Sequence, residues 1–542
     1  MNKNFLLIII AFGIIMSCKN TLNVGDIYDT SEKLNIIEIK GIVSSLVKDK
    51  DSFIGFFLQD NRLNNFTGQY FSSSEKVEVG DKIKLKILKS YDNNSDLFFE
   101  IIDLKKISKN HSVGYKKVSF PLSENDLKLL VGKYVEIQNE MIISDAYNYL
   151  KYGLLEVSTE KMIQSTEKFD AQIEKNQIIS FDRKQKTNSI TLDDFSDFEN
   201  PETLYLDPAK IQIGGKILSI RGLITEYKEK IRLRVSEDLS VEKLTKYSFG
   251  DYDSGIKIMS FNVQNLFNGD GLGGGFPTKR GAKNLIQYQK QLIKLKNTIG
   301  IAKPDIVALM EIENDGFDSL STLHQFCEFI SKNSSKNYLI SPNIESPGKD
   351  QIKTALIYDS TVVKVKKSGI YYPSSLFSRS PLFQEFSFED SLKFIVSVNH
   401  FKSKSTRGAK NLNLDQKDSQ ASFNYKRIQQ SKKLNSIIDS LYQNIPLIVL
   451  GDFNSYTKED PIQEITLNLN RLKTNSYSYV YKGRFGNLDH VFVNNQILPF
   501  IKSIETLDIN TSSPNWMDYK SNRWGNSYLR SSDHNPLIIY LY

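Results

Sequence analysis

The second half of this sequence alternates two kinds of apolar pattern, and this alternation restricts the possible fold more than any other feature. Residues 256–263 and 446–450 are compact apolar segments of the length of a β-strand. Residues 283–301 and 426–441 instead carry apolar side chains three and four positions apart, which predicts amphipathic helices. Strands that alternate with helices in this way indicate a layered α/β domain over residues 255–542.

Polar side chains stand at the ends of the predicted strands. Four strands carry them at their C-terminal ends: Asn262, Glu311, His400, and Asp452 with Asn454. Two later strands are preceded by them: Asp489-His490 and Asp533-His534. If all these groups share one edge, the last two strands run antiparallel to the other four. The sequence therefore predicts mixed sheets rather than a parallel Rossmann sheet.

These residue types suit hydrolysis of a phosphodiester. Hard oxygen ligands bind Mg²⁺, Mn²⁺ or Ca²⁺ in preference to zinc. The side chains that offer such oxygens are Asn262, Glu311, Asp533 and, as a further candidate, Asp452. A hard cation neutralises a phosphate, and two histidines can move one proton from water and another to the leaving group. Asp489 is available to fix the tautomer of His534.

Six motifs carry a resemblance to a known family. In chain order they are Ser260–Phe267, Met310-Glu311, Asn399–Lys404, Gly451–Asn454, Leu488–His490 and Ser532–Pro536. Their order resembles that of the endonuclease/exonuclease/phosphatase superfamily, over about residues 256–542. The resemblance implies the four-layer α/β sandwich of pancreatic-type deoxyribonuclease, in which helices flank two mixed β-sheets. The glycine-rich stretch 269–282 further resembles the large extracellular nucleases of bacteria.

The resemblance also implies roles for the matching residues. The metal ligands would be Asn262, Glu311 and Asp533. The catalytic residues would be His400, His534, Asp452, Asn454 and Asp489. His400 and His534 would form the acid and base pair, while Asp452 and Asn454 would orient the attacking water and the scissile phosphate. The motifs do not identify a carboxylate that supports His400, and Asp350 is our candidate.

Three basic residues are predicted to contact the substrate. Arg379, in the segment Ser378–Leu382, resembles the phosphate-contacting arginine of the family. Lys402 and Lys404 lie in a basic run directly after His400, which places them where they could meet phosphates. The same run is also compatible with an ordinary solvated loop.

The first half of the chain reads as two mainly β domains. Residues 34–110 alternate apolar and polar side chains in short segments, which predicts a small antiparallel barrel of the OB type, with a β-sandwich as the alternative. Residues 115–240 contain similar short segments and predict a second OB-like β domain with a long insertion. The polar stretch 241–254 is a predicted linker.

The N-terminus resembles a bacterial lipoprotein signal. Lys3 precedes an apolar run, Phe5 to Met16, that is short for a membrane span. The run ends at Ser17-Cys18, and the chain turns polar immediately afterwards. We therefore expect a signal peptide over residues 1–17, lipidation of Cys18, and a linker over 18–33. The protein would be exported and anchored to a bacterial membrane or the cell surface, and an ordinary cleaved signal peptide is the alternative.

Composition limits the remaining function classes. Only two cysteines are present, so no disulfide framework or cysteine-ligated zinc cluster can form. A formal net charge of +7 permits a polyanionic partner without requiring one. We predict a Mg²⁺-dependent, sequence-nonspecific endonuclease that favours DNA, with Mn²⁺ or Ca²⁺ as alternative metals and no evident obligate protein partner. The alternatives are a sphingomyelinase-like phosphodiesterase on lipid headgroups and a non-catalytic surface protein that binds polyanions.

Overall fold

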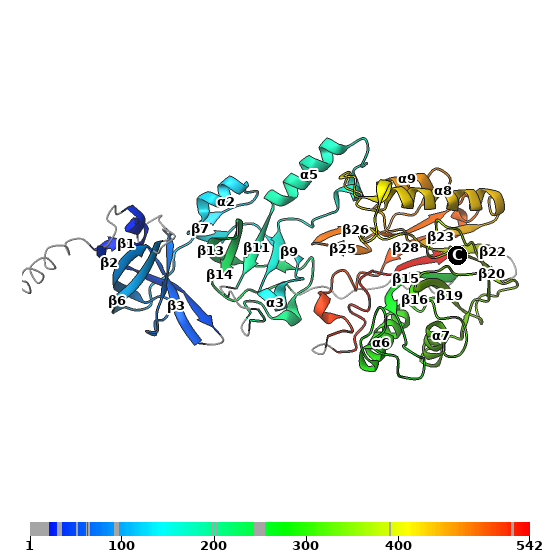
Figure 1. The fold of residues 1–542 in the computed structure, drawn as a ribbon, viewed down its shortest axis with the longest axis horizontal. Coiled ribbons are helices and arrows are strands. Elements are labelled where there is room, and N and C mark those ends of the chain that lie inside the picture. The colour runs from blue at the N-terminus through cyan, green and yellow to red at the C-terminus, as the bar shows by residue number, and fades with distance from the viewer. Residues whose placement is uncertain are drawn as a thin grey trace, which may run out of the picture. The chain divides into compact units, whose positions relative to one another are not determined.

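The computed structural model describes residues 21–29, 35–49, 52–60, 62, 66–91, 97–194, 196, 199–201, 204–242, 255–389, 392–521 and 525–541 (Figure 1). The chain forms two compact units: the first holds residues 1–160, 184–211 and 215–243, and the second holds 161–183, 212–214 and 244–542. The predicted signal peptide and the lipidation site Cys18 lie outside the described residues. Within the described ranges, no helix has the length and apolar character needed to cross a membrane.

The first sheet of the first unit has six strands in the order β4-β3-β2-β5-β6, with β1 paired to β2. Its elements are β1 (Leu22–Asn23), η1 (Val24–Asp29), β2 (Asn35–Asp49), β3 (Ser52–Gln59), β4 (Gly68–Ser72), β5 (Lys82–Tyr91) and β6 (Leu97–Ser108). The period-two pattern holds, since Ile83, Leu85 and Ile87 are fully buried in one core. The β-rich character of this region is confirmed, and its assignment as an OB barrel stays a prediction.

Part of the predicted linker 18–33 belongs to this sheet instead. Leu22 and Asn23 pair in parallel with Ile39 and Lys40 of β2. Val24 and Ile27 follow them and are fully buried in the same core. The linker prediction was wrong over residues 21–29, because two apolar side chains in a short polar context carry no visible periodicity.

The second sheet of the first unit has eight strands in the order β12-β9-β10-β11-β14-β13-β8-β7. These strands are β7 (Lys116–Val118), β8 (Tyr134–Ile137), β9 (Met141–Asp145), β10 (Leu155–Ser158), β11 (Ser189–Asp193), β12 (Lys216–Ile217), β13 (Ile220–Tyr227) and β14 (Lys230–Val235). The accompanying helical elements are α2 (Glu124–Leu130), α3 (Tyr149–Tyr152) and η2 (Pro208–Lys210). Helix α2 begins where it does because Ser123 and Asp126 form a reciprocal capping box.

Residues 161–183 lie within the range predicted for the second β domain but belong to the second compact unit. They contain α4 (Ser165–Lys168) and most of α5 (Lys175–Thr187). The predicted boundary of that domain is therefore corrected at this insertion. The physical reason is backbone pairing, since the Phe485 N–H donates to the Met162 carbonyl and the Phe485 carbonyl accepts from the Gln164 N–H.

Two mixed sheets form the centre of the second unit. The first has the order β17-β19-β16-β15-β29-β28, and the second has the order β18-β20-β21-β22-β23-β27-β24. The first sheet contains β15 (Ile256–Leu266), β16 (Ile306–Glu313), β17 (Tyr338–Ile340), β19 (Ile352–Asp359), β28 (Ile501–Thr506) and β29 (Leu537–Leu541). The second contains β18 (Asn343–Ile344), β20 (Gly369–Tyr371), β21 (Leu382–Phe388), β22 (Leu392–His400), β23 (Leu447–Asp452), β24 (Asn470–Arg471) and β27 (Asp489–Val493).

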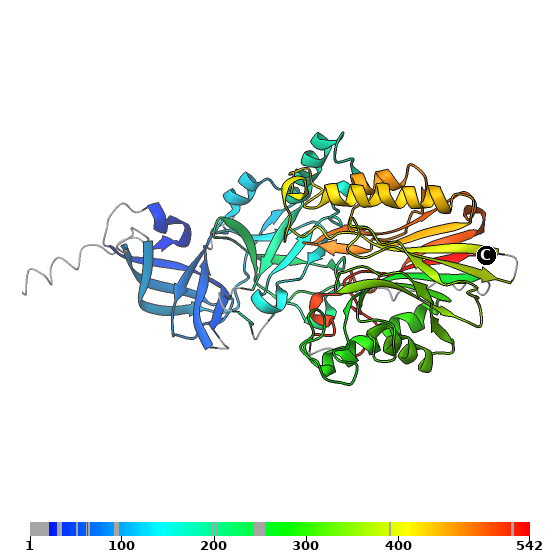
Figure 2. The same cartoon turned by 45° about the vertical axis from the view of Figure 1, so that its right-hand side comes forward.

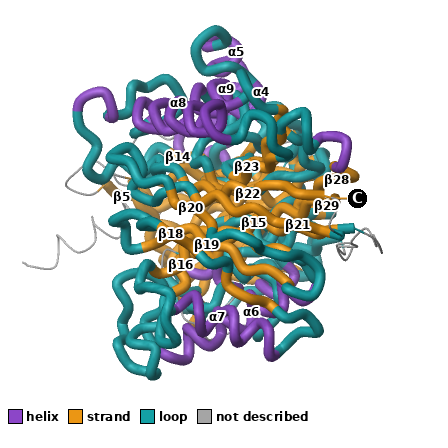
Figure 3. Tube along the Cα trace, turned by 90° about the vertical axis from the view of Figure 1, so that its right-hand side faces the viewer, coloured by secondary structure: helices purple, strands orange, loops and turns teal. Residues whose placement is uncertain are grey.

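Helices cover the outer face of each sheet, which completes the four layers seen in Figures 2 and 3. One layer contains α6 (Leu285–Ala302) and α7 (Thr322–Lys332), and the other contains α8 (Asn424–Leu441) and α9 (Asp460–Ile465). The remaining elements are the hairpin β25 (Tyr479–Tyr481) and β26 (Arg484–Gly486), and the short helices η3 (Asn411–Asn413), η4 (Leu498–Phe500) and η5 (Asn515–Met517).

Successive side chains of each strand point to opposite faces of its sheet, and the four layers therefore enclose three hydrophobic cores. Ile258 of β15 points into the core between the two sheets, while its neighbour Met259 packs under α6 and α7. Ile448 and Val449 of β23 divide in the same way between the central core and the layer of α8 and α9. The predicted four-layer α/β sandwich is confirmed.

The predicted strand directions are also confirmed. β15 runs parallel to β16, and β22 runs parallel to β23. β29 is antiparallel to β15, and β27 is antiparallel to β23. The C-terminal ends of the first four strands and the N-terminal ends of the last two therefore face the same edge of the sandwich.

Candidate active site

The polar groups predicted at the strand ends meet across the two sheets. Asn262 of β15 is fully buried, and its Nδ2 donates to Oε1 of Glu311 at 3.3 Å and to Oδ2 of Asp452 at 3.2 Å. Glu311 belongs to the sheet of Asn262, whereas Asp452 belongs to the other sheet. A single amide therefore links the two halves of the sandwich at this edge. Ser532, which precedes β29 of the sheet of Asn262, donates through Oγ to the Asn262 carbonyl at 2.7 Å.

Two residues of the site have unusual backbone conformations. Glu311 has φ of 69° and Asn454 has φ of 50°, both in the left-handed region that side-chain-bearing residues seldom adopt. Such conformations cost about 1–3 kcal/mol each and cluster at functional sites. Gly451 has φ of 133°, and a Cβ there would lie 2.0 Å from the Asn399 carbonyl oxygen. The close pairing of β22 and β23 therefore requires glycine at position 451.

His534 is held by side chains on two sides. Its Nδ1 lies 2.7 Å from Oδ2 of Asp489, so the contact predicted between these residues is present. The Tyr479 ring lies over the imidazole at 4.6 Å between centroids. Burial lowers the pKa of His534, but the Asp489 carboxylate and its hydrogen bond raise it more, and the pKa lies well above its usual value.

His400 has different surroundings. Its Nε2 lies 3.5 Å from Oδ2 of Asp452 and 4.0 Å from Oε1 of Glu311. Its Nδ1 is buried and has no hydrogen-bond partner among the residues that the structure describes. Burial lowers the pKa of His400 well below its usual value, and the positive charge of Arg379 lowers it further. Burial thus favours the neutral form of this imidazole, whereas the surroundings of His534 favour the charged form.

The expectation that Asp350 supports His400 was wrong. Asp350 Oδ2 instead accepts a hydrogen bond from Nη1 of Arg379 at 2.8 Å. Arg379 is buried and also donates to the backbone carbonyls of His400, at 3.1 Å, and Phe401. Asp350 is thus linked to His400 through Arg379 and the His400 backbone carbonyl rather than through the imidazole. The phosphate contact expected of Arg379 stays a prediction.

The two candidate lysines after His400 differ in their pairing. Lys404 Nζ lies 2.6 Å from Oε1 of Glu459, whose side chain is fully buried. Lys402 Nζ lies 3.3 Å from the Ser403 hydroxyl and 4.4 Å from the centroid of the Phe423 ring. The ammonium of Lys404 is therefore engaged in a buried ion pair, and substrate contact by either lysine stays a prediction.

Asp452 and Asn454 are oriented by hydrogen bonds to backbone groups of two loops. The Asn454 backbone N–H donates to Oδ1 of Asp452 at 2.8 Å, and Nδ2 of Asn454 donates to the Phe401 carbonyl at 3.2 Å. Burial raises the pKa of Asp452 to about 7. Asp533 directly precedes His534, and its negative charge acts on Glu311. The structure thus brings together the metal and catalytic residues predicted from the motifs.

The sequence analysis missed Tyr479 and Ser478, which lie at the start of the β25–β26 hairpin. Ser478 Oγ accepts hydrogen bonds from the backbone N–H groups of Leu488 and Asp489, at 3.1 Å each. The sequence did contain a signal for this hairpin, because Lys482-Gly483 stands between alternating aromatic residues. In the structure both residues adopt positive φ. Such a pair is typical of a tight hairpin turn.

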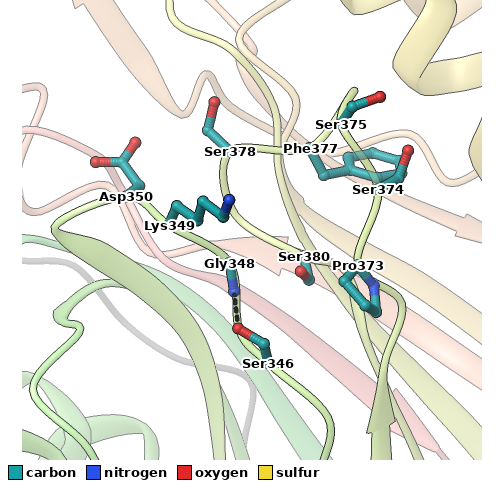
Figure 4. A pocket seen from close by; sticks show the side chains of 10 residues that line it. All are labelled: Ser346, Gly348, Lys349, Asp350, Pro373, Ser374, Ser375, Phe377, Ser378 and Ser380. Carbon is teal, nitrogen blue, oxygen red and sulfur yellow. Dashed lines mark hydrogen bonds between the residues drawn. The ribbon is translucent and has the colours of Figure 1, made fainter.

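A cavity of about 710 Å³ lies beside the Asp350–Arg379 pair. Figure 4 shows the side chains around it, which are Ser346, Gly348, Lys349, Asp350, Pro373, Ser374, Ser375, Phe377, Ser378 and Ser380. Serine hydroxyl groups, the Lys349 ammonium and the Asp350 carboxylate therefore line the space next to the predicted phosphate-contacting arginine.

The chain is similar to several solved structures. Among solved structures, an endonuclease/exonuclease/phosphatase from Bacteroides vulgatus is 15% identical with a TM-score of 0.35, covering 54% of this chain and 99% of that chain. The catalytic domain of human Nocturnin with bound sulfate is 18% identical with a TM-score of 0.33, covering 53% and 94%. A mannosyl-6-phosphatase from Bacteroides thetaiotaomicron is 13% identical with a TM-score of 0.32, covering 53% and 99%.

The sequence itself also matches a family. No curated protein matches this chain. The family model described as Endonuclease/Exonuclease/phosphatase family matches residues 259–534. This range begins in β15 and ends at His534, and it contains all the metal and catalytic residues predicted from the motifs. The chain therefore belongs to the endonuclease/exonuclease/phosphatase family.

Proposed function

We propose that this chain is a metal-dependent phosphodiesterase that cleaves nucleic acid internally, without sequence preference and with DNA as the favoured substrate. The observation that carries the proposal is the approach of both imidazoles to one carboxylate. Nε2 of His400 and Nε2 of His534 lie 3.5 and 4.0 Å from Oδ2 of Asp452. A phosphodiester held at Asp452 would have a neutral imidazole that can accept a proton and a charged imidazole that can donate one.

A divalent cation is part of the proposal, with Mg²⁺ as the first choice and Mn²⁺ or Ca²⁺ as alternatives. Burial raises the pKa of Glu311, and the nearby charge of Asp533 raises it further. Two carboxylates that repel each other in a partly buried place suit a hard cation. Nδ2 of Asn262 faces Glu311 and Asp452, and its Oδ1 accepts from the Gln264 backbone N–H at 3.0 Å, so this amide would have to turn to offer its oxygen to the cation. Within the described part of the chain, no three acidic, histidine or cysteine side chains are grouped as a complete metal site. Water or substrate oxygens would complete the ligand set.

When bound, the cation would stabilise negative charge on the phosphate and on the leaving oxygen. The residues of the chain would supply the other functions. Asp489 holds Nδ1 of His534, which leaves Nε2 free to exchange a proton with the reacting oxygens. Asp452 and Asn454, held by hydrogen bonds to backbone groups, would orient the attacking water and the scissile phosphate.

The surroundings of the site support a long polyanionic substrate. Lys402 and Arg379 place positive charge beside His400, and the serine-lined cavity next to Arg379 could take a neighbouring part of the substrate. Phosphate contacts of this kind give affinity without reading the base sequence. The net charge of +7 agrees with such a substrate.

A digestion assay tests the proposal against the two alternatives. The purified full chain is incubated with plasmid DNA and with sphingomyelin vesicles, with Mg²⁺ or with EDTA. We expect nicking and linearisation of the plasmid in Mg²⁺ and none in EDTA. The variants His400→Ala and Glu311→Ala should each lose about a thousandfold in rate, because each removes a group needed in the transition state.

The control variant is His111→Ala, which removes a histidine of the first unit that hydrogen-bonds Ser108. It should cleave plasmid at the wild-type rate. Activity on sphingomyelin alone would replace the nuclease by a lipid phosphodiesterase. Binding of DNA without cleavage of either substrate would identify the chain as a polyanion-binding protein.

A further inference from the structure

The insertion in the first half of the chain reaches the active-site loops. Residues 161–183, here called the strap, belong to the same compact unit as the catalytic sheets. The strap pairs with the β25–β26 hairpin, since Phe485 N–H donates to the Met162 carbonyl at 2.9 Å and Gln164 N–H donates to the Phe485 carbonyl at 2.8 Å. Ser165 and Thr166 of α4 are buried at this contact. Figure 3 shows α4 beside α9.

One carboxylate of the strap binds two loops at once. Oε1 of Glu167 accepts hydrogen bonds from Oγ1 of Thr457 at 2.6 Å and from Nδ2 of Asn487 at 2.8 Å. Oε2 accepts from the backbone N–H of Asn487 at 3.0 Å and from that of Thr457 at 3.3 Å. Both oxygens are therefore used, and each oxygen contacts both loops.

The two loops carry three of the catalytic residues. Thr457 closes the short segment that follows Asp452 and Asn454 at the end of β23. Asn487 precedes Leu488 and Asp489 at the start of β27. A shift of Glu167 would therefore displace the water-orienting pair and the carboxylate that holds His534.

The residue beside Glu167 reaches a third loop. Thr166 Oγ1 donates to Oε1 of Glu459 at 3.0 Å, and Glu459 holds the ammonium of Lys404 in the loop after His400. The hairpin on which the strap pairs also carries Tyr479, whose ring covers His534. The strap is thus connected to the loop after His400 through Glu459, and it pairs with the hairpin that covers His534. It makes these contacts from a segment far away in the sequence.

We infer that Glu167 is a positioning residue for the catalytic loops, an inference that rests on the proposed phosphodiesterase function. Loops without regular hydrogen bonding need such external contacts to hold catalytic groups in a productive geometry. Hydrogen bonds to an ionised acceptor are stronger than neutral ones, which suits a carboxylate to this task. Because Glu167 lies behind the loops, it acts through them rather than on the substrate.

The test compares Glu167→Ala and Glu167→Gln with the wild-type full chain. Steady-state hydrolysis of a fluorescent DNA duplex in Mg²⁺ gives kcat and KM. Hydrogen–deuterium exchange of peptides over residues 452–459 and 486–490 reports loop order without any substrate. We expect Glu167→Ala to lower kcat at least about tenfold with KM within about twofold, and to speed exchange in both peptides. Glu167→Gln should retain more activity, since its one oxygen can still accept from either pair of donors.

The matched control is Asp182→Asn, which breaks the 2.7 Å ion pair between the strap and Arg484 on a partly exposed surface. This variant should keep wild-type kcat and wild-type exchange. Thr457→Val removes the shortest of the four bonds from the other side and should lower kcat in the same way as Glu167→Ala. If Glu167→Ala fails to fold, the Thr457→Val variant tests the inference in its place.

Wild-type kcat and unchanged exchange in both peptides of folded Glu167→Ala would overturn the inference. So would a loss confined to KM, because that result would place Glu167 in substrate binding. If the wild-type chain cleaves no phosphodiester, the proposed function fails. The exchange measurement still decides whether Glu167 orders the two loops.

Discussion

The two candidate catalytic histidines are positioned in different ways. His534 precedes its strand, and its ring is fixed by the Asp489 hydrogen bond and covered by Tyr479. His400 ends β22, where its backbone is in register with Asp452 of β23, and its Nδ1 has no partner among the described residues. The ring of His534 is thus held by side chains, whereas strand pairing places the backbone of His400. The comparison teaches that two residues of one site can be placed by different parts of the fold, one by side-chain contacts and the other by strand register.

The largest expected effect that tests this comparison of the two histidines is a loss of kcat. Asp489→Asn should lower kcat by about a hundredfold to a thousandfold, because an amide holds the wrong tautomer of His534. Asp350→Asn should lower kcat less than about tenfold, since Asp350 contacts Arg379 rather than His400. Initial rates of plasmid nicking in Mg²⁺ measure both variants against wild type.

Thermal unfolding of both variants serves as the control, because a folding defect would lower rates without any change at the histidines. Equal losses of kcat in two well-folded variants would contradict the comparison. That result would mean that Asp350 supports His400 when substrate is bound.

The second effect is the pH dependence of stability, measured in EDTA. His534 has a raised pKa, so its stabilising contribution is complete below about pH 6.5 and is lost as pH rises through its folded pKa. His400 has a lowered pKa, so stability is lost as pH falls below about 6.5, where the unfolded chain takes up a proton. The two histidines should therefore destabilise the protein on opposite sides of that pH.

Urea unfolding between pH 5 and 9 measures this difference in the relevant unit, since both tryptophans lie within residues 244–542. His534→Gln should flatten the alkaline side of the stability curve, and His400→Gln should flatten the acidic side. A variant that flattens the opposite side would show that the charge states of the two imidazoles have been exchanged.

The sequence predicted the fold of the second unit well because its signals are local. Apolar strand segments, helical spacing and the polar groups at strand ends lie within a few residues of one another, and the directions of β27 and β29 followed from them. The pair of His534 and Asp489 was predictable for a related reason, since both residues stand at or just before the N-terminal ends of strands that face the same edge of the sandwich.

The contacts that the sequence did not predict share a different cause. Glu167 meets Thr457 across 290 positions, and no periodicity near Glu167 indicates that contact. Asp350 had two partners within reach, and the choice of Arg379 depends on side-chain geometry that a sequence pattern does not contain. Val24 and Ile27 were assigned to a linker because two buried side chains are too few to form a pattern.

The smallest expected effect is on the salt dependence of KM, and it concerns the two lysines that follow His400 after β22. Lys402→Gln should raise KM for DNA a few-fold and reduce the slope of log KM against log salt by about one, because one phosphate contact is lost. Lys404→Gln should leave the salt slope unchanged, since its ammonium already pairs with Glu459. Kinetics on one DNA duplex from 50 to 200 mM salt, roughly the range in which phosphate contacts dominate, measure both slopes. An equal decrease in both variants would mean that Lys404 leaves Glu459 when DNA binds. The loop after His400 would then be shaped by substrate, whereas the Asp489 side is already formed.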